Sequence, residues 1–101
     1  MDINLAPIYV VTTVRHSLMA GKRSVGFFHE FKTAEDHLRS NAYDINECGY
    51  YPYAVIEEVK PGFYTFPRTE HWFRWDVDNE RYIKMLEKPD RFKKACGWSL
   101  G

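Results

Sequence analysis

Basic residues gather at the ends of the segment from Arg15 to Arg23, which also carries His16 and Lys22. Guanidinium and ammonium groups donate charge-assisted hydrogen bonds to phosphate oxygens, so this segment could clamp a phosphate. Charged loops are also commonly just solvated, and that alternative stays open here.

A second basic group is interleaved with indole rings. Arg68 and Arg74 flank Trp72, and Trp75 follows. A nucleobase stacks on aromatic rings while arginine neutralises the adjoining phosphates, so this pattern fits a nucleotide-like small molecule. It fits a protein interface equally well, because Trp, Tyr and Arg dominate binding hot spots. The sequence leaves these two ligands unranked.

Aromatic residues are concentrated in the segment Tyr43 to Tyr82, where eleven positions carry a ring. A domain of this size buries only about two thirds of its unfolded surface, so we expect some rings to remain accessible and to bind a second molecule. Among the tyrosines around Pro52, Tyr51 and Tyr53 are expected in the core. Tyr50 is expected to face outward. The alternative is that all three line a groove for a proline-rich peptide.

Carboxylates offer a different class of function, a small hydrolase or nuclease that holds a divalent ion with Asp44, Glu47 or Glu57. Glu57 and Glu58 are neighbours on a predicted strand and so point to opposite faces. Asp44 and Glu47 have the spacing of a capping box that opens one helical turn, which explains that pair more simply. No nucleophile motif or phosphate-binding glycine loop occurs. We therefore predict a non-enzymatic protein and keep the hydrolase as the alternative.

The histidines and cysteines show no metal-ligand spacing. His29 and His37 are a pair that a strand packed on a helix could bring together, whereas Cys48 and Cys96 lie far apart in the chain. We therefore predict no metal site, no cofactor and no structural disulfide.

Length and composition indicate one soluble domain over residues 1–101. Fourteen basic residues balance fourteen acidic ones, so no global field favours nucleic acid or an anionic membrane. Single-stranded nucleic acid bound through the rings is a third alternative, which this charge balance disfavours. No secretion signal opens the sequence, and no apolar run approaches the roughly 20 residues of a membrane span. We expect a cytoplasmic protein.

Patterning along the chain predicts the elements that must position these residues. Residues 8–14 are β-branched or aromatic throughout, as in a central strand. Residues 24–31 form a second strand that Gly26 interrupts, either as a bulge or where another backbone comes close. Thr33 is expected to cap a helix over 34–41 with a thin apolar stripe. The remaining predicted elements are strands over 51–59, 71–77 and 81–87 and a short helix over 90–96.

Together these elements predict an α+β domain of order ββαβββ, in which a mainly antiparallel sheet of four to five strands carries one main helix on one face. A single covering helix leaves the opposite face either wet or paired with another subunit. We therefore expect the spare rings to matter on that open face, and we expect a homo-oligomer.

The succession IYVVTTV, VGFF, NAYDINE, YPYAVIEEV, PGFY and WFRW, within residues 8–76, resembles small accessory proteins encoded by bacteriophages and prophages. Such proteins often block bacterial defence by gripping a host protein or by sequestering a cyclic-nucleotide signal. The resemblance implies an anti-defence protein in the host cytoplasm that acts as an oligomer. The contact residues predicted from the sequence itself are Arg15, Lys22, Arg23, Tyr50, Arg68, Trp72, Arg74 and Trp75.

Overall fold

The computed structural model describes residues 6–17, 21–60 and 69–93, and every structural statement below concerns these residues. Four features predicted from the sequence lie outside them: Arg68, the turn at Pro61, Cys96 and the end of the expected C-terminal helix. The chain runs through β1 (Ile8–Val14), β2 (Lys22–Phe28), α1 (Phe31–Arg39), η2 (Ala42–Asp44), β3 (Tyr53–Val59), β4 (Glu70–Asp76), β5 (Arg81–Lys84) and η3 (Asp90–Phe92).

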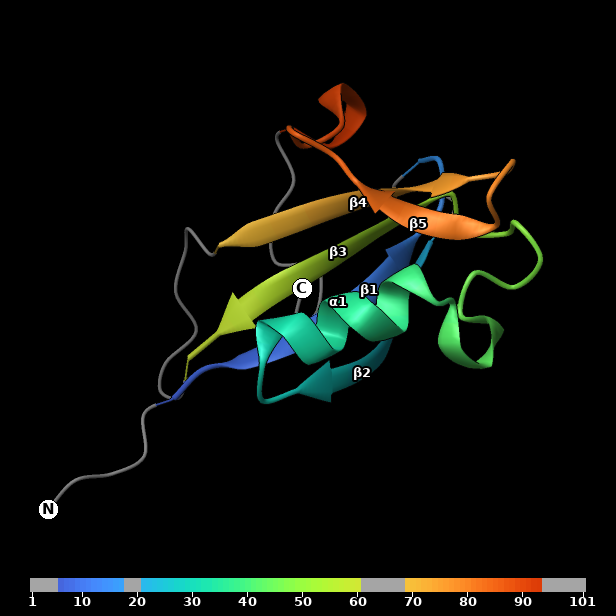
Figure 1. Ribbon diagram of the computed structural model, residues 1–101. Helices are drawn as coiled ribbons and strands as arrows, with labels where there is room; N and C mark the ends of the chain where they lie inside the picture. Colours follow the sequence, from blue (N-terminus) through green and yellow to red (C-terminus); the bar gives the residue numbers. More distant parts are fainter. Residues whose placement is uncertain (1–5, 18–20, 61–68, 94–101) are drawn as a thin grey trace, which may run out of the picture.

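Five strands form one antiparallel sheet in the order β2-β1-β3-β4-β5, with α1 across one face (Figure 1). This arrangement confirms the predicted α+β class. The ladder between β1 and β2 is irregular, because Val11 pairs with Gly26 while Thr12 pairs with Ser24. Val25 is therefore the extra residue of a β-bulge. The strands β2 and β5 lie at the two edges of the sheet.

The start of α1 differs from the prediction. The helix begins at Phe31, and its cap position is Glu30, which has an extended backbone and makes no side-chain capping bond. Thr33 was wrong as the cap, because it lies inside the helix and its carbonyl accepts a 2.9 Å hydrogen bond from the His37 ring. The Phe31 ring packs on the sheet, 6.0 Å from the Tyr9 ring. This tertiary contact begins the helix earlier than the capping pattern predicts.

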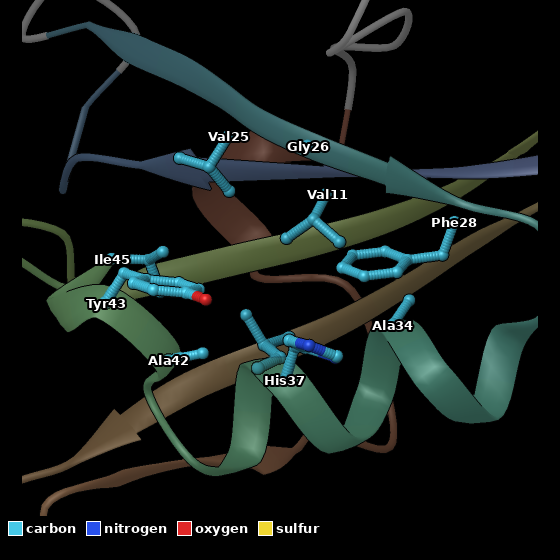
Figure 2. A pocket seen from close by; sticks show the side chains of 10 residues that line it. Val11, Val25, Gly26, Phe28, Ala34, His37, Ala42, Tyr43 and Ile45 are labelled. Carbon is cyan, nitrogen blue, oxygen red and sulfur yellow. The ribbon is translucent and has the colours of Figure 1, made fainter.

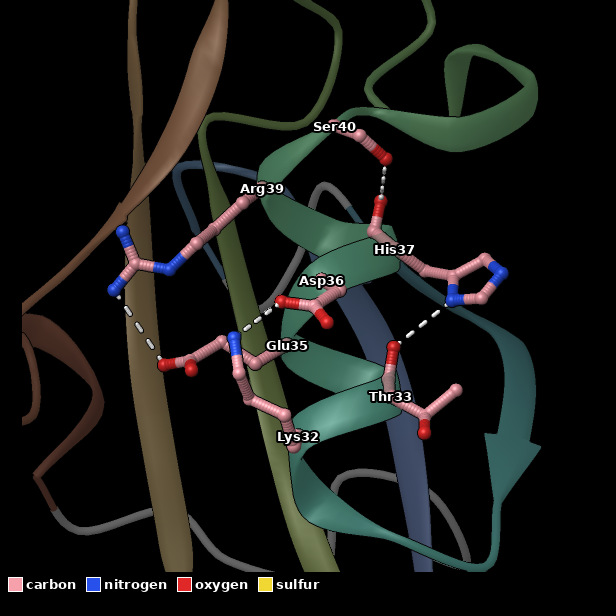
Figure 3. A network of polar contacts seen from close by, with 7 residues as sticks. All are labelled: Lys32, Thr33, Glu35, Asp36, His37, Arg39 and Ser40. Atoms are coloured by element: carbon pink, nitrogen blue, oxygen red, sulfur yellow. Dashed lines mark hydrogen bonds and ion pairs between the residues drawn. The ribbon is translucent and has the colours of Figure 1, made fainter.

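The outer side of α1 carries ion pairs between successive turns (Figure 3). Lys32 meets Asp36 at 2.7 Å, and Arg39 meets Glu35 at 3.5 Å. Exposed pairs at this spacing stabilise a helix by only about 0.3–0.5 kcal/mol each. The buried side of the helix therefore positions it on the sheet. The core residues of this helix-covered face are Val11, Ala34, Leu38, Ala54, Ile56, Phe73 and Tyr82.

The opposite face of the sheet is also covered, contrary to the expectation of an open face. Val14 and Val55 are fully buried there, and Trp72 is only 3% exposed. The Trp72 ring stacks on Phe92 of η3 with ring centroids 5.5 Å apart. The chain thus folds its own C-terminal turn over this face. Among the described residues, the predicted C-terminal helix is a single 3-10 turn.

Candidate functional site

The segment from Asn41 to Tyr50, here called the aromatic loop, joins α1 to β3. Its backbone is left-handed at several non-glycine residues. These are Asn41, Tyr43, Asp44, Glu47 and Cys48. Such conformations cost of order 1–3 kcal/mol each and persist only when the surroundings hold them in place.

Asn46 supplies that restraint from inside the loop. Its side chain is fully buried and donates to the Tyr51 carbonyl at 2.8 Å and to the Tyr82 hydroxyl at 3.3 Å. The Asn46 N–H donates to the Asn41 side chain, and its own side-chain oxygen accepts from the Gly49 N–H. The Tyr82 hydroxyl in turn donates to the Tyr51 carbonyl at 2.7 Å. Burial raises the pKa of Tyr82 to about 12, so this hydroxyl keeps its proton.

Two arginines clamp the aromatic loop from outside. The Arg15 guanidinium lies 3.8 Å from the centre of the Tyr50 ring, and Arg23 of β2 pairs with the Glu47 carboxylate at 2.6 Å. Three residues predicted as ligand contacts, Arg15, Arg23 and Tyr50, are therefore brought together at one end of the sheet. Glu47 is not the second half of a capping box, because its carboxylate binds Arg23.

The carboxylate of Asp44 accepts hydrogen bonds from within the aromatic loop. The hydrogen bond from the Asn41 side chain, aided by the Cys48 N–H, lowers the pKa of Asp44. The Asp44 charge in turn raises the pKa of the Cys48 thiol. Cys48 therefore stays protonated near neutral pH and is a poor nucleophile.

A pocket, here called the edge pocket, opens between β2 and α1 beside the aromatic loop (Figure 2). Its volume is about 200 Å³, and its walls are mainly aliphatic and aromatic. Gly26 contributes to its depth, because a Cβ at this position would meet no atom within 4 Å. The lining residues are Val11, Val25, Gly26, Phe28, Ala34, His37, Leu38, Ala42, Tyr43 and Ile45.

Two aromatic groups shape the walls of the edge pocket. The rings of Phe28 and His37 lie in contact, with centroids 4.7 Å apart, and join β2 to α1. Tyr43 comes from the aromatic loop, where Figure 2 shows its ring next to Ile45. Its side chain is 98% exposed although its backbone is held left-handed. A large ring in a strained backbone and open to solvent is a strong candidate for a partner contact.

The other predicted contact residues are dispersed. Trp72 is a core residue whose indole N–H donates to Glu70 at 2.9 Å. Trp75 is half-buried and packs edge-on against Tyr82, and Arg74 is exposed between these two tryptophans on β4. Successive strand residues point to opposite faces, so Trp72 and Trp75 do not form one stacking site. Lys22 is exposed at the start of β2.

The carboxylates of the hydrolase alternative are also separated. Glu57 is fully buried in β3, whereas Asp44 and Glu47 belong to the aromatic loop. In the described part of the chain, no group of three His, Cys, Asp or Glu residues could hold a metal ion. The described geometry offers this alternative no assembled site.

The chain matches no known family model, no curated protein and no solved structure. None of the described helices is both long and apolar enough to cross a membrane. The fold and site define an α+β protein with an apolar edge pocket and an aromatic loop that the buried Asn46 restrains.

Sequence reasoning did not single out Tyr43 or Asn46. One signal was present: both lie in a segment rich in residues that tolerate left-handed backbone, such as Asn and Asp. Tyr43 also falls outside the apolar stripe expected for the helix. An aromatic residue in such a segment is a candidate for exposure.

Proposed function

We propose that this protein is a non-enzymatic binding protein whose edge pocket and aromatic loop receive an apolar side chain of a partner protein. The observation that carries the proposal is the open apolar pocket of about 200 Å³ beside the exposed Tyr43 ring. An apolar cavity of roughly 150 Å³ accepts a benzene ring, so the pocket has room for one large side chain. The locked loop adds affinity, because little conformational entropy remains to be lost on binding.

A protein partner fits this site better than a nucleotide. Drug-sized ligands occupy pockets of about 300–1,000 Å³, which is larger than the edge pocket. None of the described residues that line the pocket is Arg or Lys, so the described part of the chain offers phosphate groups no counter-charge there. The two arginines of the clamp are engaged with the loop, where Arg23 pairs with Glu47 and Arg15 stacks on Tyr50.

The resemblance to phage accessory proteins supports one setting for this binding. In that setting the partner is a host protein of bacterial defence, and occupying its surface blocks the defence. The clamp residues Arg15 and Arg23 keep the recognition loop in shape, and Tyr43 makes the contact.

Phage plating tests the proposal. The protein is expressed in bacteria that carry individual defence systems, and the efficiency of phage plating is measured. We expect wild type to restore plating against at least one system and Tyr43→Gly to lose this effect. Glycine suits the left-handed backbone, so the variant should fold at least as stably as wild type. Leu86→Gly, which removes another fully exposed apolar side chain, is the control expected to retain activity.

Three results would contradict the proposal. The first is full activity of Tyr43→Gly, and the second is no activity of wild type against any defence system. The third is a thermal shift with cyclic nucleotides. Ligand at a hundred times its dissociation constant stabilises a protein by about 2.7 kcal/mol, and such a rise would favour sequestration of a nucleotide signal instead.

A further inference from the structure

The outer side of β2 is an unpaired strand edge. β2 extends over Lys22–Phe28, and no described strand pairs with its outer side. The other sheet edge, β5, extends only over Arg81–Lys84. A row of free backbone N–H and C=O groups is a template for pairing with another chain. Among the described residues, β2 is therefore the better docking edge.

Phe27 makes this edge apolar. Its side chain is 60% exposed and has an edge-on contact with the His29 ring, 6.1 Å away. The neighbouring Gly26 offers no side chain. Phe27 thus presents an exposed ring to a second strand that pairs with β2.

We propose that a second copy of this chain pairs its β2 antiparallel to this one, across a two-fold axis at Phe27. In this register Phe27 faces Phe27 of the partner subunit, and Gly26 faces Phe28 of the partner subunit. Directly opposed aromatic residues stabilise antiparallel strands.

The charges at the two ends of β2 favour a second copy as the occupant. Lys22 and Arg23 begin the strand, and Glu30 follows its end with an extended backbone, φ −131° and ψ 138°. In this register Glu30 of each copy lies opposite Ser24 of the other, next to Arg23, which also pairs with Glu47 of its own chain. Parallel pairing would align the basic ends and repel.

Such a dimer would extend the sheet without a break. The two-fold axis is perpendicular to the sheet, so both α1 helices and both edge pockets lie on the same face. Phe27 lies on the other face, because side chains alternate along the strand and Phe28 lines the pocket. Dimerisation therefore leaves the pockets open, and it goes beyond the proposed function by giving each assembly two recognition sites.

Charged substitutions at Phe27 test the register directly. Sedimentation velocity is recorded for wild type, Phe27→Glu and Phe27→Lys, each alone and with the two variants mixed. Wild type should dimerise at micromolar to submillimolar concentrations, since a small interface of this kind is usually weak. Each variant alone should be monomeric because identical charges then face each other. The mixture should recover the dimer, at least tenfold tighter than either variant alone.

Val77→Glu and Val77→Lys are matched controls, because Val77 is also an exposed apolar residue but lies in the turn between β4 and β5. They should dimerise like wild type. Circular dichroism checks that all variants fold. A monomeric wild type overturns the proposal, as does dimerisation of either Phe27 variant alone or a mixture that stays monomeric. Phage plating is scored separately, so loss of the dimer and loss of partner binding are distinguishable.

Discussion

The two faces of the sheet use aromatic residues in different ways. On the face opposite α1, Trp72 and Phe92 stack in a closed apolar layer. On the helix-covered face, the buried hydroxyl of Tyr82 joins Asn46 in a polar network that holds the aromatic loop. The first face has the Trp72 and Phe92 rings inside the fold, and its exposed ring, Phe27, lies at the β2 edge. The second presents Tyr43 to solvent beside a pocket.

This difference assigns fold stability to the face opposite α1 and partner recognition to the helix-covered face. A stacked layer is stabilised by buried area and dispersion, and the rings inside it, Trp72 and Phe92, are not available to a partner. A polar network restrains a loop in a conformation that the loop would not adopt alone, and it can therefore hold an exposed ring in place. The excess of aromatic residues in the sequence is thus partly structural and partly available for binding.

The largest expected effect is on the closed face. Phe92→Ala removes a side chain that is 1% exposed and that also packs edge-on against Tyr53. We expect a loss of about 3–5 kcal/mol in the free energy of unfolding, measured by urea denaturation, because a buried ring leaves a cavity. Leu86→Ala, at a fully exposed apolar side chain, is the control expected to change stability little. A loss below about 1 kcal/mol would show that η3 does not seal this face.

The second effect is on the loop network. Asn46→Ala deletes the donor to the Tyr51 carbonyl and the acceptor of the Gly49 N–H. We expect about 2–3 kcal/mol lower stability, since buried polar groups lose partners. Hydrogen exchange should increase at Gly49. Asn79→Ala, which removes an exposed asparagine bonded to Asp76, should cost much less. Equal losses of stability in the two variants would show that the buried hydrogen bonds of Asn46 do not hold the loop.

Physical reasons explain which features the sequence could predict. The strand Ile8–Val14 was predicted at its observed bounds because every residue in it favours a buried strand. The start of α1 was missed because Phe31 packs against Tyr9 and His71, and these contacts join distant segments. The edge pocket depends on a bulge and on the position of a helix. The bulge was one of the two interpretations of Gly26 in the sequence, whereas the position of the helix beside it is not encoded in a local pattern.

A smaller effect concerns pH and the contact of α1 with the sheet. Burial, with a contribution from Lys84, lowers the pKa of His71, while Glu58 and Glu35 oppose this shift. Near pH 6.5 the unfolded chain therefore binds a proton at His71 more readily than the folded chain does. Stability is highest above this pH and falls as the pH drops below it.

His71→Leu should flatten this dependence between pH 7 and pH 5. The measurement is the midpoint of urea unfolding at each pH, compared between variant and wild type. His29→Leu, at an exposed histidine, is the control and should keep the wild-type slope. An unchanged slope in His71→Leu would assign the acid sensitivity to other groups.

The last substitution has the smallest expected effect on stability, and it tests most directly whether the two faces of the sheet differ in partner recognition. Gly26→Val adds a side chain where no atom lies within 4 Å of the new Cβ, and the backbone there is not left-handed. Valine suits a strand better than glycine, so the free energy of unfolding should stay equal or rise by up to about 1 kcal/mol. The new side chain occupies the edge pocket. It points perpendicular to the sheet, so it leaves the β2 edge free to pair.

Partner recognition should therefore be lost in Gly26→Val while folding and dimerisation persist. Phage plating, urea unfolding and sedimentation read these three properties separately. Retained plating activity would mean that the pocket is not the contact, and the exposed Tyr43 ring alone would then carry recognition. If Gly26→Val is a fully stable dimer that has lost activity, the helix-covered face recognises the partner through the edge pocket. The stacked layer on the opposite face has no such pocket among the described residues.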